Sequence, residues 1–218
     1  MARIIEFEKG EFYHIYNRGV DKRTIFEDEA DRWWFMHLLY HCNTSTPLLR
    51  EMIDLATDLA LPKKDSYAEI AAYCLMPNHF HLLLREPSGT GITSFMHKLG
   101  TAYTKYFNMK YDRTGSLLEG TFKAKYIDTD EYLKHTFGYI ALNPAKLADS
   151  LWKERRGGSQ ETLAFVKEYP FSSTKEYLGS RKKYAPIIKP ECLPFENRDT
   201  RMDNLLSWWL EYREPIKH

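Results

Sequence analysis

The sequence of 218 residues has few cysteines and no long apolar segment. Its three cysteines, Cys42, Cys74 and Cys192, are far apart and form no C-x-x-C pair, which argues against a disulfide framework or a zinc ribbon and favours a reducing compartment. No apolar run approaches the roughly 18 residues of a membrane-spanning helix, and the first residues lack the pattern of a signal peptide. Repeats and low-complexity segments are also missing. These absences predict a cytoplasmic protein without membrane association.

Charge is nearly balanced, at a net +1, but it is unevenly distributed. Residues 97–125 contain two acids and six basic residues, interleaved with five tyrosines and phenylalanines. The basic residues are Lys98, Lys105, Lys110, Arg113, Lys123 and Lys125. Basic and aromatic side chains in alternation are typical of a surface that follows a phosphate backbone and stacks on bases. A solvated helix face whose aromatic residues point into the core would give the same composition.

Hydrophobic periodicity predicts an α+β fold. Alternating or apolar runs predict strands at 12–19, 66–76, 79–86 and 117–127. Helical spacing predicts helices at 28–42, 93–110 and 128–142, the last opened by a capping box at Asp128 and Glu131. Another helical stretch at 46–62 interrupts this order and is interpreted as an insert. The order of elements implies a mostly antiparallel, ferredoxin-like sheet with helices on its faces.

The chain after about residue 150 has a different pattern. It holds two stretches with helical spacing, 159–168 and 200–212, and a basic run at 181–183. We therefore expect a first domain at 1–150, including the insert, and a helical C-terminal extension at 151–218.

The segment PNHFHLLL carries two histidines at the start of an apolar strand. Side chains alternate along a strand, so His79 and His81 share one face while Phe80, Leu82 and Leu84 share the other. Two imidazoles separated by roughly 6–7 Å along a strand can converge on one metal ion. Imidazole suits Mn, Zn, Fe or Ni, whereas Mg prefers oxygen ligands. The same pair could be two packed histidines, and metal hydrolases of other folds also contain H-x-H.

The segment TFGYIALNPAK supplies a phenol and a carboxamide. On a helix over 130–142, Tyr139 and Asn143 are four residues apart and share a face. The phenolic oxygen suits a nucleophile and the amide oxygen suits a neutral metal ligand. A tyrosine hydroxyl has a pKa near 10, so it needs a metal or a base to react. By pattern alone, Tyr103 and Tyr106 on the preceding helix fit as well, and Tyr139 could be an ordinary helix aromatic.

Several segments together carry a resemblance to a known family. YHIYNRG, PNHFHLLL, RTGSLLEGTFKAK, YIALNPAK and YPFSST resemble segments of the single-tyrosine HUH transposases, and among them the REP-associated tyrosine transposases, over roughly residues 10 to 180. The resemblance implies a ferredoxin-like domain in which His79, His81 and Asn143 bind Mg or Mn. It implies that Tyr139 attacks a phosphodiester of single-stranded, hairpin-forming DNA, leaving a 5′-phosphotyrosine and a free 3′-hydroxyl. Relatives include monomers and homodimers.

The chain departs from that family at one motif. Relatives often carry a G-x-L-W-x-x-R pattern after the glycine turn, whereas this chain has Leu118 and Thr121 there, a difference that concerns DNA sequence preference. The insert and the tail beyond Gly179 also lie outside the pattern. The residues expected to contact DNA are Arg18, Lys98, Lys105, Arg113, Lys123 and Lys125.

Two other functions compete with a strand-transfer enzyme. A domesticated DNA-binding protein would keep the fold and bind hairpin DNA through Arg18, Lys123 and Lys125, without transposing. A small metal-dependent hydrolase would use the histidine pair to activate water and would need a carboxylate base, for which Asp128 and Glu119 are the nearby candidates.

Overall fold

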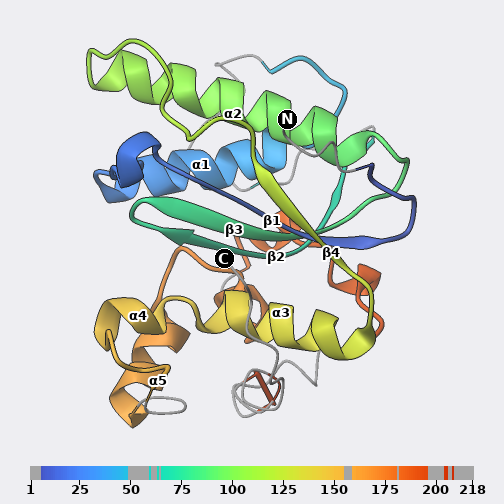
Figure 1. The fold of residues 1–218 in the computed structure, drawn as a ribbon, viewed down its shortest axis with the longest axis vertical. Helices are drawn as coiled ribbons and strands as arrows, with labels where there is room; N and C mark the ends of the chain where they lie inside the picture. Colours follow the sequence, from blue (N-terminus) through green and yellow to red (C-terminus); the bar gives the residue numbers. More distant parts are fainter. Residues whose placement is uncertain are drawn as a thin grey trace.

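A four-stranded antiparallel sheet with the order β2-β3-β1-β4 forms the centre of the molecule (Figure 1). The computed structural model describes residues 6–48, 59, 63, 65–154, 159–180, 182–195, 204, 205 and 208. The strands are β1 (Phe12–Arg18), β2 (Glu69–Met76), β3 (His79–Arg85) and β4 (Lys123–Ile127). The predicted strand at 117–127 is too long, because Leu118 makes only an isolated bridge to Gly19 and regular pairing begins at Lys123.

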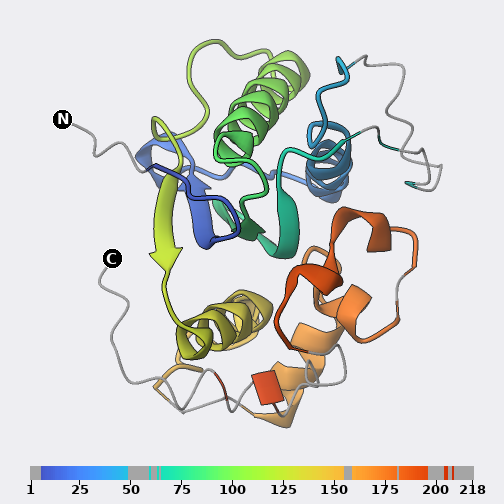
Figure 2. The same ribbon diagram turned by 90° about the vertical axis from the view of Figure 1, so that its right-hand side faces the viewer.

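Helices cover both faces of this sheet (Figures 1 and 2). Helices α1 (Glu29–His41) and α2 (Gly91–Lys110) lie side by side on one face, and α3 (Asp130–Leu142) lies on the other. The connections β1-α1-β2 and β3-α2-β4 give the split βαβ arrangement of a ferredoxin-like fold. The predicted α+β class and the antiparallel sheet are therefore confirmed.

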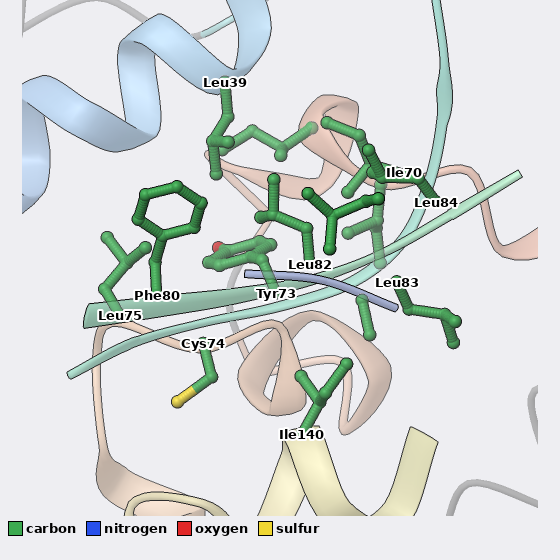
Figure 3. Close-up of a cluster of buried hydrophobic side chains, with 14 of the residues drawn as sticks. Leu39, Ile70, Tyr73, Cys74, Leu75, Phe80, Leu82, Leu83, Leu84 and Ile140 are labelled. Carbon is green, nitrogen blue, oxygen red and sulfur yellow. The ribbon is translucent and has the colours of Figure 1, made fainter. Parts of the chain in front are cut away.

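Burial on both faces explains the near-continuous apolar runs of β2 and β3. Phe80 and Leu82 point towards Leu39 of α1, whereas Cys74 points to the opposite side, towards Ile140 of α3 (Figure 3). The face that carries the two histidines of β3 is consequently packed under α3.

Two helices begin at caps that the sequence encodes. The capping box of α1 joins the side chains of Asp28 and Asp31 to each other's backbone N–H groups. The predicted cap of α3 at Asp128 is wrong by one residue. Thr129 has the extended backbone of an N-cap, and its side chain accepts a hydrogen bond from the N–H of Tyr132.

The chain after α3 forms α4 (Ala145–Ala148), α5 (Gln160–Glu168) and α6 (Thr174–Tyr177). Helix α5 confirms the helix predicted at 159–168. Short 3-10 turns lie at Val20–Lys22, Ala185–Ile187 and Pro190–Cys192. The predicted insert at 46–62 and the helix at 200–212 fall almost wholly outside the described residues.

The three cysteines are free thiols, as the sequence predicts. Within the described part of the chain, no helix combines the length and apolarity that crossing a membrane requires.

Candidate active site

Strand β3 presents both histidines next to strand β1. In the pairing of the two strands, His79 lies opposite Arg18 and His81 lies opposite Tyr16. The centroids of the two imidazole rings are 5.0 Å apart. The predicted pair therefore shares one face of the sheet, near one end of β1.

Each imidazole is fixed through its Nδ1 atom. His81 Nδ1 lies 2.9 Å from Nε2 of His14 on β1, and His79 Nδ1 lies 2.6 Å from Oδ1 of Asn78. The Nε2 atom of His81 is buried and has no hydrogen-bond partner in the described part of the protein. An anchored Nδ1 and an available Nε2 are the usual arrangement of a metal-binding histidine.

Burial keeps both rings neutral at physiological pH. Burial, with a smaller contribution from the cations of Lys146 and Arg18, lowers the pKa of His79 to about 4. Burial, with contributions from His14 and His79, also lowers the pKa of His81 well below its ordinary value. Neutral imidazole is the form that binds a metal ion.

Helix α3 brings Tyr139 and Asn143 to the same place. The ring of Tyr139 lies 5.4 Å from that of His81 and 5.9 Å from that of His14, measured between centroids. Burial raises the pKa of Tyr139, and the neighbouring amide of Asn143 opposes part of that rise. Within one chain, a helix phenol thus lies beside two sheet imidazoles that are distant from it in the sequence.

Asn143 is fully buried at the end of α3. Neither its Oδ1 nor its Nδ2 atom has a partner of normal hydrogen-bond geometry among the described residues. A buried carboxamide is costly unless it is satisfied. The amide oxygen is therefore a candidate third ligand, next to Tyr139.

A pocket of about 510 Å³, called here the histidine pocket, opens over these groups. Its lining residues are Tyr16, Asn17, Arg18, Lys22, Asn78, His79, His81, Lys123, Tyr139 and Lys146. Four of them are cationic and none is a carboxylate. A cation-lined pocket attracts phosphate, and the lack of a carboxylate in its described wall leaves no acidic base for a hydrolase.

The site does not resemble a conventional protein-only metal cluster. No group of three or more His, Cys, Asp or Glu side chains is placed to hold a metal ion in the described ranges. The two imidazoles lie side by side, His81 lies beside Tyr139, and Tyr139 has the amide of Asn143 as a neighbour. This set fits a divalent ion that completes its coordination with oxygen atoms of a substrate.

Three of the residues predicted to contact DNA lie on the histidine face. Arg18 and Lys123 line the histidine pocket, and Lys125 pairs across the sheet with His14. Arg18 forms an ion pair with Glu119, and both side chains are about two-fifths exposed. Glu119, one of the candidate bases for a hydrolase, is held in this ion pair and does not line the histidine pocket.

The other three residues lie on or after α2. The ammonium group of Lys98 donates to the backbone carbonyls of Thr44 and Thr46, so it holds a loop. Arg113 donates to Oδ1 of Asn108. Lys105 is exposed.

The aromatic residues interleaved with these cations point mostly inward. Tyr103 and Phe107 are buried, and the hydroxyls of Tyr106 and Tyr111 donate to Asp31. Residues 97–125 therefore do not form one continuous stacking surface. The alternative nucleophiles Tyr103 and Tyr106 do not line the histidine pocket. Their hydroxyls donate hydrogen bonds within the protein, to the carbonyl of Ile25 and to Asp31 respectively.

Three site residues escaped the sequence reasoning. His14 contacts His81, and the ammonium groups of Lys146 and Lys153 lie 5.4 and 5.0 Å from the ring centroid of Tyr139. Burial, aided by Lys153, lowers the pKa of Lys146 to about 8. His14 and Lys146 lie inside the motifs YHIYNRG and YIALNPAK, but only the strand register and the turn after α3 place them here.

A known protein family matches the part of the chain that contains these site elements. The family described as "Transposase IS200 like" matches residues 35–142, about half of the chain, from α1 to the end of α3. This chain belongs to the IS200-like transposase family. The match includes His79, His81 and Tyr139 and ends one residue before Asn143. As a member of that family the protein is a DNA-cleaving transposase.

A solved structure supports the fold of this transposase. It is described as "Structure of the REP associates tyrosine transposase bound to a REP hairpin". The two chains share 15% sequence identity with a TM-score of 0.55, and the similarity covers 90% of this transposase and 96% of the other chain. Among curated proteins, none matches the transposase.

Proposed function

We propose that this transposase cleaves and rejoins single-stranded DNA through a 5′-phosphotyrosine formed on Tyr139. One observation carries the proposal: the ring of Tyr139 packs 5.4 Å from that of His81, in a cation-lined pocket that both histidines share. The phenolic oxygen bonds to phosphorus and the bond to the 3′ oxygen breaks. The phenol loses its proton, and the leaving oxygen gains one. The covalent link conserves the bond, so attack by a 3′-hydroxyl can reverse the step without ATP.

His79, His81 and Asn143 would hold a divalent ion, Mg or Mn. Two neutral imidazoles anchored through their Nδ1 atoms and a buried amide favour such an ion. When bound, the ion supplies Lewis-acid polarisation of the scissile phosphate and a fixed position for its oxygens. His14 and Asn78 keep the two rings oriented.

Nearby cations would bind the DNA backbone and the developing negative charge. Arg18, Lys22 and Lys123 line the outer wall of the histidine pocket, where they would contact phosphate oxygens. Lys146 and Lys153 flank the ring of Tyr139 and would stabilise the phenolate, which burial otherwise disfavours.

We further propose that the DNA substrate contains a hairpin, because the similar solved transposase is bound to a REP hairpin and shares the fold over most of this chain. Tyr139 reaches the histidines of its own chain, so a monomer can form the complete site, and a homodimer is not required. We expect its place of action to be the cytoplasm.

Covalent trapping tests this proposal. The purified protein is incubated with Mn²⁺ or Mg²⁺ and with hairpin oligonucleotides taken from the DNA that flanks its gene, each labelled at the 3′ end. We expect a labelled protein–DNA adduct on a denaturing gel. Tyr139→Phe should reduce the adduct at least about 1,000-fold because the nucleophile is lost, while DNA affinity changes by less than about threefold.

Tyr16→Phe is the matched control, since Tyr16 lines the same pocket. It should still form the adduct, and peptide mapping should place the DNA on Tyr139. An adduct that persists in Tyr139→Phe would show that another residue is the nucleophile. DNA binding without any adduct would favour the domesticated DNA-binding protein.

A further inference from the structure

An ion pair lies at the edge of the histidine pocket. Arg18, which lines the pocket, donates from Nε and from Nη2 to the two carboxylate oxygens of Glu119. A guanidinium binds a phosphate through the same pair of parallel hydrogen bonds. Glu119 itself does not line the pocket. Its carboxylate therefore occupies the donors of Arg18 that a DNA phosphate would otherwise take.

Two further cations of the pocket act on the same carboxylate. The hydrogen bond from Arg18 lowers the pKa of Glu119, and the nearby charges of Lys123 and Lys22 lower it further. Both lysines line the pocket and are exposed. One carboxylate thus lies near three of the four cations of the pocket. A phosphate of a DNA backbone at this position would meet the same three positive charges.

The backbone around Glu119 is fixed independently of its carboxylate. The N–H of Glu119 donates to the carbonyl of Arg18 at 2.8 Å. In the next peptide, Nδ2 of Asn17 donates to the carbonyl of Gly120 at 3.3 Å. Release of the Arg18 guanidinium therefore requires only rotation of the Glu119 side chain, while the loop and strand β1 stay in place.

A well-placed phosphate can replace the carboxylate at little cost. Both side chains of the pair are about two-fifths exposed, and an ion pair that water reaches contributes little to stability. A phosphate whose DNA is already anchored elsewhere on the protein acts at a high effective concentration, whereas the phosphates of loosely bound DNA do not. The carboxylate therefore competes most strongly against DNA that binds through charge alone.

We propose that Glu119 is a specificity-determining residue, which occupies the phosphate site of Arg18 and yields it only to DNA whose neighbouring phosphate is seated in the histidine pocket. Unstructured DNA leaves the ion pair closed and does not gain the contact with Arg18. The substrate hairpin opens the ion pair and gains that contact, so the carboxylate acts against the wrong ligand. This inference rests on the proposed function, because it takes the histidine pocket to bind a phosphate of the DNA substrate.

Affinity measurements with two DNA molecules test the inference. The Tyr139→Phe protein, which does not cleave, is titrated with oligothymidine and with a hairpin of the same length, chosen as the tightest binder among those that flank the gene. Glu119→Gln keeps the shape of the side chain and removes its charge. It should raise the affinity for oligothymidine about tenfold and the affinity for the hairpin less than about threefold. The preference for the hairpin should therefore fall at least about threefold.

A variant of Arg18 shows whether Glu119 acts through it. Arg18→Gln should weaken hairpin binding about tenfold, because a charged hydrogen-bond donor to phosphate is lost. It should change oligothymidine binding less than about twofold, since that DNA does not reach Arg18 in the parent protein. In the Arg18→Gln background, Glu119→Gln should change either affinity by less than about twofold. An equal effect of Glu119→Gln with and without Arg18 overturns the inference.

The salt dependence of binding gives an independent readout. Glu119→Gln adds one phosphate contact for oligothymidine, so the slope of log affinity against log salt should steepen by about 0.7 for that DNA and stay unchanged for the hairpin. Glu131→Gln is the matched control. It removes the same charge from the exposed first turn of α3, beside Asp130 at the end of the sheet away from His79. Both affinities should stay within about twofold of the parent protein.

Three other results overturn the inference: equal gains of Glu119→Gln for both DNA molecules, a control variant with the same effect, and a parent protein that binds both DNA molecules equally. Adduct formation separates this inference from the proposed function. An adduct on the unmutated protein with an unchanged hairpin preference in Glu119→Gln defeats only the role of Glu119. A reduced preference without any adduct on the unmutated protein defeats only the cleavage chemistry.

Discussion

At the residue scale, His14 and Asn78 play the same part: His14 orients the ring of His81, and Asn78 orients the ring of His79. Each partner bonds to the Nδ1 atom of a β3 imidazole and leaves its Nε2 atom for another ligand. A second bond of this kind fixes the tautomer and the ring orientation of a metal ligand. The Nε2 atom of His14 is engaged with His81, so we infer that His14 is a positioning residue.

We expect His14→Ala to weaken Mn²⁺ binding about 10- to 100-fold, because His81 would lose its fixed orientation. Isothermal titration of Mn²⁺ into the Tyr139→Phe protein measures this without turnover. His14→Gln, which can still bond to Nδ1 of His81, should recover part of the affinity. His97→Ala, on the exposed side of α2, is the control and should leave the affinity unchanged. Equal affinities for His14→Ala and the parent protein would refute the positioning role.

At the scale of elements, a buried carboxylate joins α1 to the C-terminal end of α2. Asp31 is fully buried and accepts hydrogen bonds from the hydroxyls of Tyr106 and Tyr111 and, at 2.7 Å, from the ammonium of Lys110. Lys110 also bonds to Asp28, the N-cap of α1. These contacts hold the C-terminal end of α2 against α1.

We expect Lys110→Met to lower the free energy of unfolding by about 1–3 kcal/mol at pH 7, because a buried charged acceptor loses a donor. Thermal or urea denaturation measures the change. Lys105→Met, on the same helix and exposed, is the control and should have little effect. Equal stability of the two variants would show that the Asp31 contacts are dispensable.

The same variant has a predictable pH dependence. The hydrogen bond from Lys110 lowers the pKa of Asp28 below its ordinary value of 3.8. A carboxylate with a lowered folded-state pKa stabilises the protein above its unfolded pKa, and this contribution is lost as pH falls through the folded value. The stability difference between the parent protein and Lys110→Met should therefore shrink below about pH 4.

At the scale of the whole molecule, the C-terminal part of the chain closes an edge of the sheet. The N–H of Leu75 in β2 donates to the carbonyl of Phe171, and the N–H of Ser173 donates to the carbonyl of Tyr73. Phe171 also packs against Trp33 of α1, with ring centroids 4.8 Å apart. Without this segment, the outer edge of β2 would expose unpaired backbone groups.

We expect a chain truncated after residue 150 to aggregate or to melt at least about 10 °C lower, because it loses this edge cover. Size-exclusion chromatography and a melting curve measure both effects. A chain ending at residue 195 keeps the contacts of residues 171–173 and is the control. A stable, monomeric 1–150 fragment would instead support the division at residue 150 as a true domain boundary.

Local patterns in the sequence were sufficient for the order and type of most elements. Alternating or apolar runs identified β1, β2 and β3, and helical spacing identified α1, α2 and α5. The start of β4 was predicted six residues too early, because Leu117 to Phe122 have strand-like composition while the loop that they form is held by Asn17. The cap of α3 was missed by one position because Asp128 and Thr129 are both good capping residues.

The sequence by itself determined which residues share a face: His79 with His81 on a strand, and Tyr139 with Asn143 on a helix. These relations follow from the periods of a strand and a helix, which any short segment carries in its own letters. Only the tertiary structure decided that His14 meets His81 and that Lys146 and Lys153 flank Tyr139. Such contacts depend on strand register and on how α3 packs across the sheet, and both are set by burial of side chains distant in sequence.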